Sequence, residues 1–244
     1  MSNSGILQMN DYTAQARTYW WVTTLLGLAA LLISVFGLSR LPTGTLLLVV
    51  TGAVLAAIAG LVPVSIPGTK TSVSAAEIFV FLLLLTCGPD AAVVAAAVEA
   101  ACISLRTSKR WTSRLASPAM AAIAMFVSSR LFVLVLPMLP SAGNNALIAK
   151  IVLLLVVAVV YFAVGTLLIA SLIKLKRSEP IQPLTIVCDH AWLGFGYACS
   201  AAIAGLLQTA FSGSLEMSTL IAATLLTAAL LSMLHLYYRR MGQA

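Results

Sequence analysis

Long apolar stretches recur along this 244-residue chain and leave it few ways to fold. Six of them approach or exceed the roughly 20 apolar residues that an α-helix needs to cross a bilayer. Because lipid offers the backbone no hydrogen-bond partners, such segments span the membrane as helices. The sequence therefore predicts an all-α integral membrane protein. The six stretches are Tyr19–Leu38, Thr43–Pro63, Pro118–Leu139, Leu147–Ile173, Cys188–Phe211 and Ser218–Tyr238.

Two shorter apolar runs, Ala75–Cys87 and Asp90–Leu105, lie on either side of Gly88 and Pro89. Glycine commonly ends a helix, and proline is favoured in the first turn of the next one. We therefore expect a short helical hairpin at this point. With it, the predicted fold is a bundle of about eight transmembrane segments.

Charged residues are scarce, which limits the classes of protein that fit. They make up 9% of the chain, against about 25% in a typical soluble domain, while 61% of the residues are hydrophobic. So little charge argues against a water-soluble enzyme surface and against a nucleic-acid-binding protein. The net charge of +7 is better explained by topology, because basic residues concentrate on the cytoplasmic side of membrane proteins.

The distribution of Lys and Arg predicts the orientation of the bundle. If the N-terminus is cytoplasmic, only Arg40 and Lys150 fall on the outer side, and Arg130 falls within a span. Both termini should then be cytoplasmic. We expect a cytoplasmic segment at 1–17, the membrane bundle at 18–240 and the start of a cytoplasmic linker at 241–244. The residues on the cytoplasmic side are Arg17, Lys70, Arg106, Lys109, Arg110, Arg114, Lys174, Lys176, Arg177, Arg239 and Arg240.

A polar turn precedes the short hairpin and contains Pro67, Gly68 and Ser72. We expect it to re-enter the membrane and to be stabilised by capping. Ser74 would be the N-cap of a helix that begins near Ala75. Glu77 would then be the third helical residue, which gives the Ser-x-x-Glu spacing of a capping box.

Two ionisable residues, Glu99 and Arg130, fall within predicted spans. A lone charge at that depth costs at least about 2.5–3.5 kcal/mol on insertion scales, so such residues usually face the bundle and pair. Their estimated depths differ by an amount that two long side chains can bridge. We therefore expect an intramembrane ion pair, which either fastens two helices together or takes part in sensing.

Few residues in the sequence are candidates for chemistry. We predict no catalytic residues, no metal site and no enzyme activity, and the sequence identifies no cofactor. Cys188, Asp189 and His190 are adjacent, but neighbouring side chains on a helix point about 100° apart and do not share a ligand. We interpret them as the start of an interfacial helix. No aromatic cage is recognisable from the sequence.

The stretch LVPVSIPGTKTSVSAAEIFVFLLLLTCGPDAAVVAAAVEA resembles the N-terminal multi-helix membrane sensor module of bacterial GGDEF and HD-GYP cyclic-di-GMP signalling proteins. The stretches YFAVGTLLIASLIKLKRSEP and LHLYYRRMGQA fit the same module. The resemblance implies a bacterial inner-membrane protein and a homodimer whose last helix runs into a cytoplasmic GGDEF or HD-GYP domain. That domain is absent from this chain, so we expect an excised module.

Two functions follow as expectations. The first is a sensory module that passes a membrane or small-molecule cue through its last helix to a cytoplasmic signalling domain. The alternative is a small-molecule transporter or a substrate-binding membrane subunit that resembles vitamin-uptake components. Transporters often contain paired interrupted helices. Only one interrupted region, between Pro63 and Pro89, is recognisable here, which favours the sensor.

Overall fold

The computed structural model describes residues 12–61, 64–65, 72–73, 76–139, 144–210 and 219–229. In this part of the chain the protein is helical apart from one pair of two-residue strands. The elements are α1 (Ala14–Leu38), α2 (Thr43–Gly60), β1 (Val64–Ser65), β2 (Ser72–Val73), α3 (Glu77–Thr86), α4 (Pro89–Thr107), α5 (Trp111–Val135), a 3-10 turn η1 (Leu136–Met138), α6 (Asn144–Arg177), α7 (Pro183–Asp189), α8 (Ala191–Ala210) and a helix at Thr219–Ala229.

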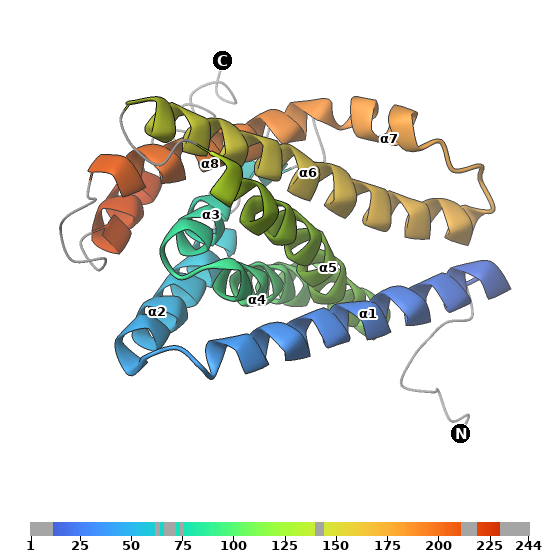
Figure 1. The fold of residues 1–244 in the computed structure, drawn as a ribbon. Coiled ribbons are helices and arrows are strands. Elements are labelled where there is room, and N and C mark those ends of the chain that lie inside the picture. Colours follow the sequence, from blue (N-terminus) through green and yellow to red (C-terminus); the bar gives the residue numbers. More distant parts are fainter. Residues whose placement is uncertain are drawn as a thin grey trace, which may run out of the picture.

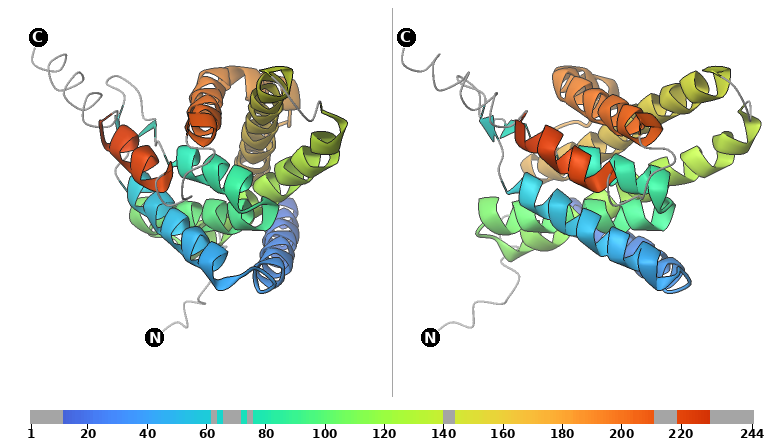
Figure 2. Two further views of the ribbon diagram at one scale, coloured as in Figure 1. Left: turned by 60° about the vertical axis from the view of Figure 1, so that its left-hand side comes forward. Right: turned by 90° about the vertical axis from the view of Figure 1, so that its left-hand side faces the viewer.

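The helices form three groups (Figure 1). α1 and α2 lie on one side, α6, α7 and α8 lie on the other, and α3, α4 and α5 lie between them. The two rotated views in Figure 2 show the same order. The middle group contacts both sides, because α4 packs against α1 and α2 while α5 packs against α6 and α3 packs against α8.

Five of the described helices are long and apolar enough to cross a membrane: α1, α2, α5 with η1, α6 and α8. α3 and the helix Thr219–Ala229 are apolar but shorter. The outward faces are also apolar. On α1, for example, Leu25, Leu32 and Phe36 are all more than half exposed. Exposed apolar surface of this extent is consistent with insertion into a bilayer, where lipid covers it.

α3 forms the centre of the core. Its residues from Ile78 to Leu84 are all at most 2% exposed, so this helix is buried on every side. A helix that is hydrophobic all round is expected in such an interior position. The strands β1 and β2 precede it and pair antiparallel, with Val64 opposite Val73 and Ser65 opposite Ser72.

Small residues let the helices approach closely. A Cβ atom added at Gly27 of α1 would lie 2.4 Å from the backbone oxygen of Ala119 on α5. At Gly52 of α2, an added Cβ would lie 2.9 Å from the side chain of Leu83 on α3. Small residues serve this purpose at helix crossings in membranes, where van der Waals packing holds the helices together.

Several predicted boundaries are wrong. Pro118 was expected at a helix edge, yet it lies inside α5, which begins seven residues earlier at Trp111. Membrane helices tolerate an internal proline because neighbouring groups satisfy the freed backbone carbonyl. The predicted span also continued to Leu139, whereas α5 ends at Val135 and Pro137 lies in the 3-10 turn that follows it.

The region after α6 also differs from the prediction. α7 was not predicted, and it begins at Pro183, where proline occupies the first helical turn. Asp189 ends α7 and His190 caps it, so the Cys188–His190 sequence marks the end of one helix and not the start of another. The next span begins at Ala191.

Candidate functional site

A cavity of about 570 Å³ opens between the middle group of helices and the α6–α8 group. This volume falls in the range of small-molecule sites, about 300–1,000 Å³. Much of its wall is apolar, and a few polar groups converge on it. α3 to α8 all contribute to the lining, including Glu77, Glu99, Met120, Tyr161, Phe162, Gly165, Ile169, Lys174, Arg177, His190 and Tyr197.

The α3–α4 hairpin brings two carboxyl groups to this cavity. Gly88, with a φ of 95°, and Pro89 at the start of α4 form its turn, and a positive φ favours glycine. Glu77 and Glu99 are each eleven residues from Gly88. At 1.5 Å per residue, each lies roughly 16 Å from the turn, about half of a 30 Å hydrocarbon core. The antiparallel hairpin thus places both at a similar depth.

Both carboxyl groups have few partners among the described residues. Glu99 is 5% exposed and makes no hydrogen bond or ion pair within the part of the chain that the structure describes. The Oε2 atom of Glu77 is buried and has no hydrogen-bond partner there either. The two groups are close enough to repel each other when both are charged. Buried polar groups usually have partners, so such a pair requires an explanation.

Aromatic rings from α6 and α8 lie near the carboxyl groups. Tyr161 and Tyr197 both line the cavity, and their ring centroids are 5.5 Å apart in an edge-on arrangement. Phe162 is 5.8 Å from Tyr197, and Phe81 of α3 is 6.2 Å from Tyr161. Both tyrosines also lie within electrostatic range of Glu77 and Glu99. The four rings form an aromatic cluster beside the two acids.

The other end of the cavity is more polar and lies where α6 meets α7. Lys174 and Arg177 line it from α6, and Asp189 and His190 line it from the end of α7. From Tyr161 to Arg177 is sixteen residues, or about 24 Å along α6. We call the region of Glu77, Glu99, Tyr161 and Tyr197 the deep end. We call the region of Lys174, Arg177, Asp189 and His190 the mouth.

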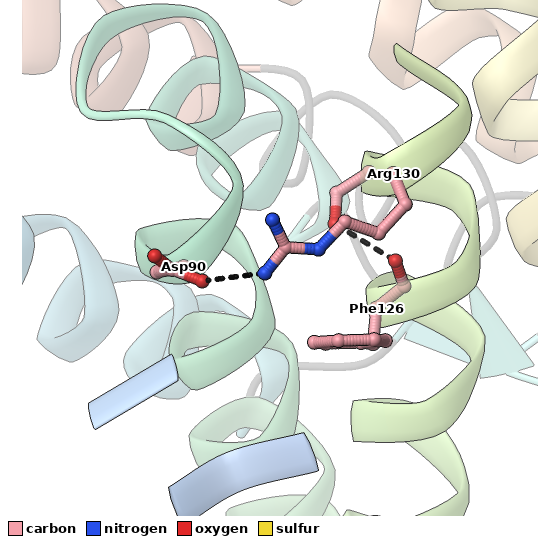
Figure 3. Close-up of polar contacts among 4 residues, drawn as sticks. Asp90, Phe126 and Arg130 are labelled. Atoms are coloured by element: carbon pink, nitrogen blue, oxygen red, sulfur yellow. Dashed lines mark hydrogen bonds and ion pairs between the residues drawn. The ribbon is translucent and has the colours of Figure 1, made fainter. Parts of the chain in front are cut away.

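The predicted Glu99–Arg130 ion pair is wrong. Nη2 of Arg130 lies 3.3 Å from Oδ1 of Asp90, and the guanidinium also lies 4.7 Å from the ring centroid of Phe126 (Figure 3). Asp90 is in the first turn of α4, where an acid is favoured by the helix dipole. It also lies against Gly37 of α1. Arg130 therefore pairs at the hairpin turn, about 14 Å along α4 from Glu99.

The predicted capping box is also not formed as expected. α3 begins at Glu77 itself, after the N-cap residue Ala76, and no side chain caps it. Glu77 is therefore the first helical residue, not the third, and it lines the cavity. Ser72 lies in β2 opposite Ser65. The predicted turn residues Pro67 and Gly68 and the predicted N-cap Ser74 lie outside the described residues.

No family model, curated protein or solved structure matches this chain. The resemblance to cyclic-di-GMP signalling modules therefore depends on the three sequence stretches alone.

The position of Glu77 and Glu99 on one cavity and the aromatic cluster were not predicted from the sequence. The equal spacing of the two acids from Gly88 was a usable signal, because an antiparallel hairpin brings residues at equal distance from its turn to the same depth. The aromatic cluster offered no such signal, since its members come from three helices that are far apart in the sequence. In the described part of the chain, no three His, Cys, Asp or Glu residues are grouped as a metal site.

Proposed function

We propose that this chain is a membrane-embedded sensory module whose cavity binds a small-molecule cue. The observation that carries the proposal is the cavity of about 570 Å³, which is lined by two carboxyl groups that make no ion pair with another described residue. Acids at such depth are costly for folding, and intramembrane ionisable residues commonly mark functional sites. The proposed module has eight membrane segments, cytoplasmic termini and a place in a bacterial inner membrane.

The helix Thr219–Ala229 is the proposed output. Thr219, Ala223 and Thr227 are at most 3% exposed and form one face that packs into the bundle. Leu220 and Ala223 belong to the same hydrophobic core as α3, which lines the cavity. A change in packing around α3 can therefore reach this helix through the core that they share. Its opposite face, with Ile221 and Leu225 more than half exposed, is available to a second copy of the chain.

A crosslinking experiment tests this proposal. The four native cysteines are replaced by serine, and Leu225→Cys is introduced to report on the proposed dimer in native membranes. Ala121→Phe then fills the cavity from α5, and we expect it to change the crosslinked fraction because the packing of the last helix depends on the cavity. The matched control is Ala29→Phe, on the exposed face of α1.

The outcome separates the sensor from the alternative. A substrate-binding or transport subunit would lose binding when the cavity is filled, but its last helix would crosslink to the same extent, or not at all. An unchanged or absent Leu225 crosslink in the Ala121→Phe variant would therefore count against the sensory function and the proposed dimer.

A further inference from the structure

We propose that the deep end of the cavity binds an organic cation: a protonated amine that carries an apolar or aromatic body. This inference deepens the proposed function and rests on it, since it names the class of cue that the cavity takes. It is carried by three features of the deep end: two acids that have no ion-pair partner among the described residues, the aromatic cluster and the apolar wall.

The first feature is the charge. Glu77 and Glu99 face one cavity, and neither makes an ion pair with another described residue. Arg130, the predicted partner of Glu99, pairs with Asp90 at the hairpin turn. The basic lining residues Lys174 and Arg177 lie at the mouth, about 20 Å or more along α6 from Tyr161. A bound cation would supply the counter-charge that the described residues do not provide at the deep end.

The second feature is the aromatic cluster. Tyr161, Phe162 and Tyr197 all line the cavity near the two acids. The face of an aromatic ring attracts a cation through its quadrupole, and the attraction grows when water is excluded. Carboxylates combined with aromatic rings form a usual environment for ammonium groups in proteins.

The third feature decides between an organic and an inorganic cation. A small hard ion prefers a complete shell of oxygen ligands. The deep end offers two carboxyl groups and the side chains of Tyr161 and Tyr197, and the apolar residues Ala96, Ala124 and Phe162 also line the cavity. An apolar wall and a volume of about 570 Å³ fit a ligand with a hydrocarbon or aromatic body of several carbons.

A thermal-shift experiment with matched probes tests the inference. The full chain is purified in nanodiscs and its melting temperature is measured with 2-phenylethylamine, with the neutral analogue 2-phenylethanol and with sodium ion alone. We expect the amine to raise the melting temperature by on the order of 5 °C near saturation, because a ligand that binds only the folded state stabilises it. The alcohol and sodium should give no comparable rise.

Variants identify the groups responsible. Glu99→Gln and Glu77→Gln should each abolish most of the amine-dependent rise. Asp90→Asn removes a carboxyl group at the hairpin turn, outside the cavity; its melting temperature without ligand should fall, but the rise with amine should remain. Equal rises with amine and alcohol, an equal rise with sodium, or a full rise in Glu99→Gln would each overturn the cation assignment.

Two further outcomes keep this test separate from the test of the sensor. If the alcohol binds as well as the amine and Ala121→Phe abolishes both, the cavity is a ligand site and only the cation class fails. In the second outcome, no probe binds, and Lys70→Gln lowers the melting temperature as much as Glu99→Gln does. Lys70 of the chain itself would then supply the counter-charge for Glu99. That result would overturn the inference, whereas the Leu225 crosslink would still report on the sensory function.

Discussion

Gly27 lies where the backbones of α1 and α5 come close together. The atoms that an added Cβ would meet are the backbone oxygen, Cα and carbonyl carbon of Ala119, at 2.4 to 2.6 Å. A backbone cannot rotate away as a flexible side chain can, so the two helices would have to separate. The absence of a side chain at this single residue therefore sets the distance between two helices.

We predict that Gly27→Ala destabilises the protein by about 1–3 kcal/mol, which is the usual cost of overpacking. The measurement is the melting temperature of the purified protein in detergent. Gly44→Ala is the matched control, since an added Cβ there meets nothing within 4 Å and the change removes a flexible glycine from α2. If both variants have the same melting temperature as the parent protein, α1 and α5 do not touch at Gly27.

At the residue scale, the sequence predicted that buried charges would pair but named the wrong partner for Arg130. The predicted Glu99–Arg130 pair assumed that both helices are perpendicular to the membrane, so that residue counts give depths. α4 instead begins beside Arg130, so the acid in its first turn, Asp90, is the one within reach. Helix tilt and rotation come from packing with neighbours, and a single sequence does not specify them.

At the element scale, α3 is the helix whose packing most defines the core. Each of its residues from Ile78 to Leu84 is buried by other helices, whereas α1 exposes a broad apolar face. Both helices are apolar, but their surroundings differ. Substitutions of the same chemical type should therefore have different consequences on the two helices.

We predict that Leu82→Ala, at a fully buried position of α3, costs about 2–5 kcal/mol because it leaves a cavity. Leu28→Ala, at a position of α1 that is 52% exposed, should change stability by about 0.5 kcal/mol or less. Reversible unfolding in a denaturing detergent, followed by circular dichroism, measures both. Similar losses in the two variants would contradict the central position of α3.

Most long helices could be predicted from the length and apolarity of their segments, and the hairpin turn was suggested by Gly88 and Pro89. The exact ends could not. α6 extends to Arg177 because Lys and Arg side chains can continue a helix out of the membrane, where hydropathy no longer marks it. α7 was missed because it has only seven residues and lacks a long apolar run.

At the scale of the whole molecule, polar contacts gather at one end of the bundle. The Tyr12 ring lies 4.8 Å from the Nζ atom of Lys176, and Thr13 donates a hydrogen bond to the carbonyl of Leu175. On the same side, Arg106 of α4 donates to the carbonyl of Leu61, after α2. These contacts join the start of α1, the end of α2, the end of α4 and the end of α6. The same end contains most of the described basic residues.

We predict that this end faces the cytoplasm, as the positive-inside rule requires. In a background with the four native cysteines replaced, Ser39→Cys, between α1 and α2, should react with a membrane-impermeant maleimide in right-side-out spheroplasts. Ser178→Cys, after α6, should react only once the membrane is opened. Both positions are exposed, so access to the reagent depends on the side of the membrane. The reverse labelling pattern would invert the proposed topology.

The α3–α4 hairpin also has an evolutionary consequence. Both acids of the deep end lie in one uninterrupted stretch, residues 77–99, whereas Tyr161, Phe162 and Tyr197 come from α6 and α8. A single recombination event that replaced this stretch would exchange both acids together and leave those three rings unchanged. Descendants of such a gene would acquire a different ligand preference in one inherited step, without rebuilding the rest of the bundle.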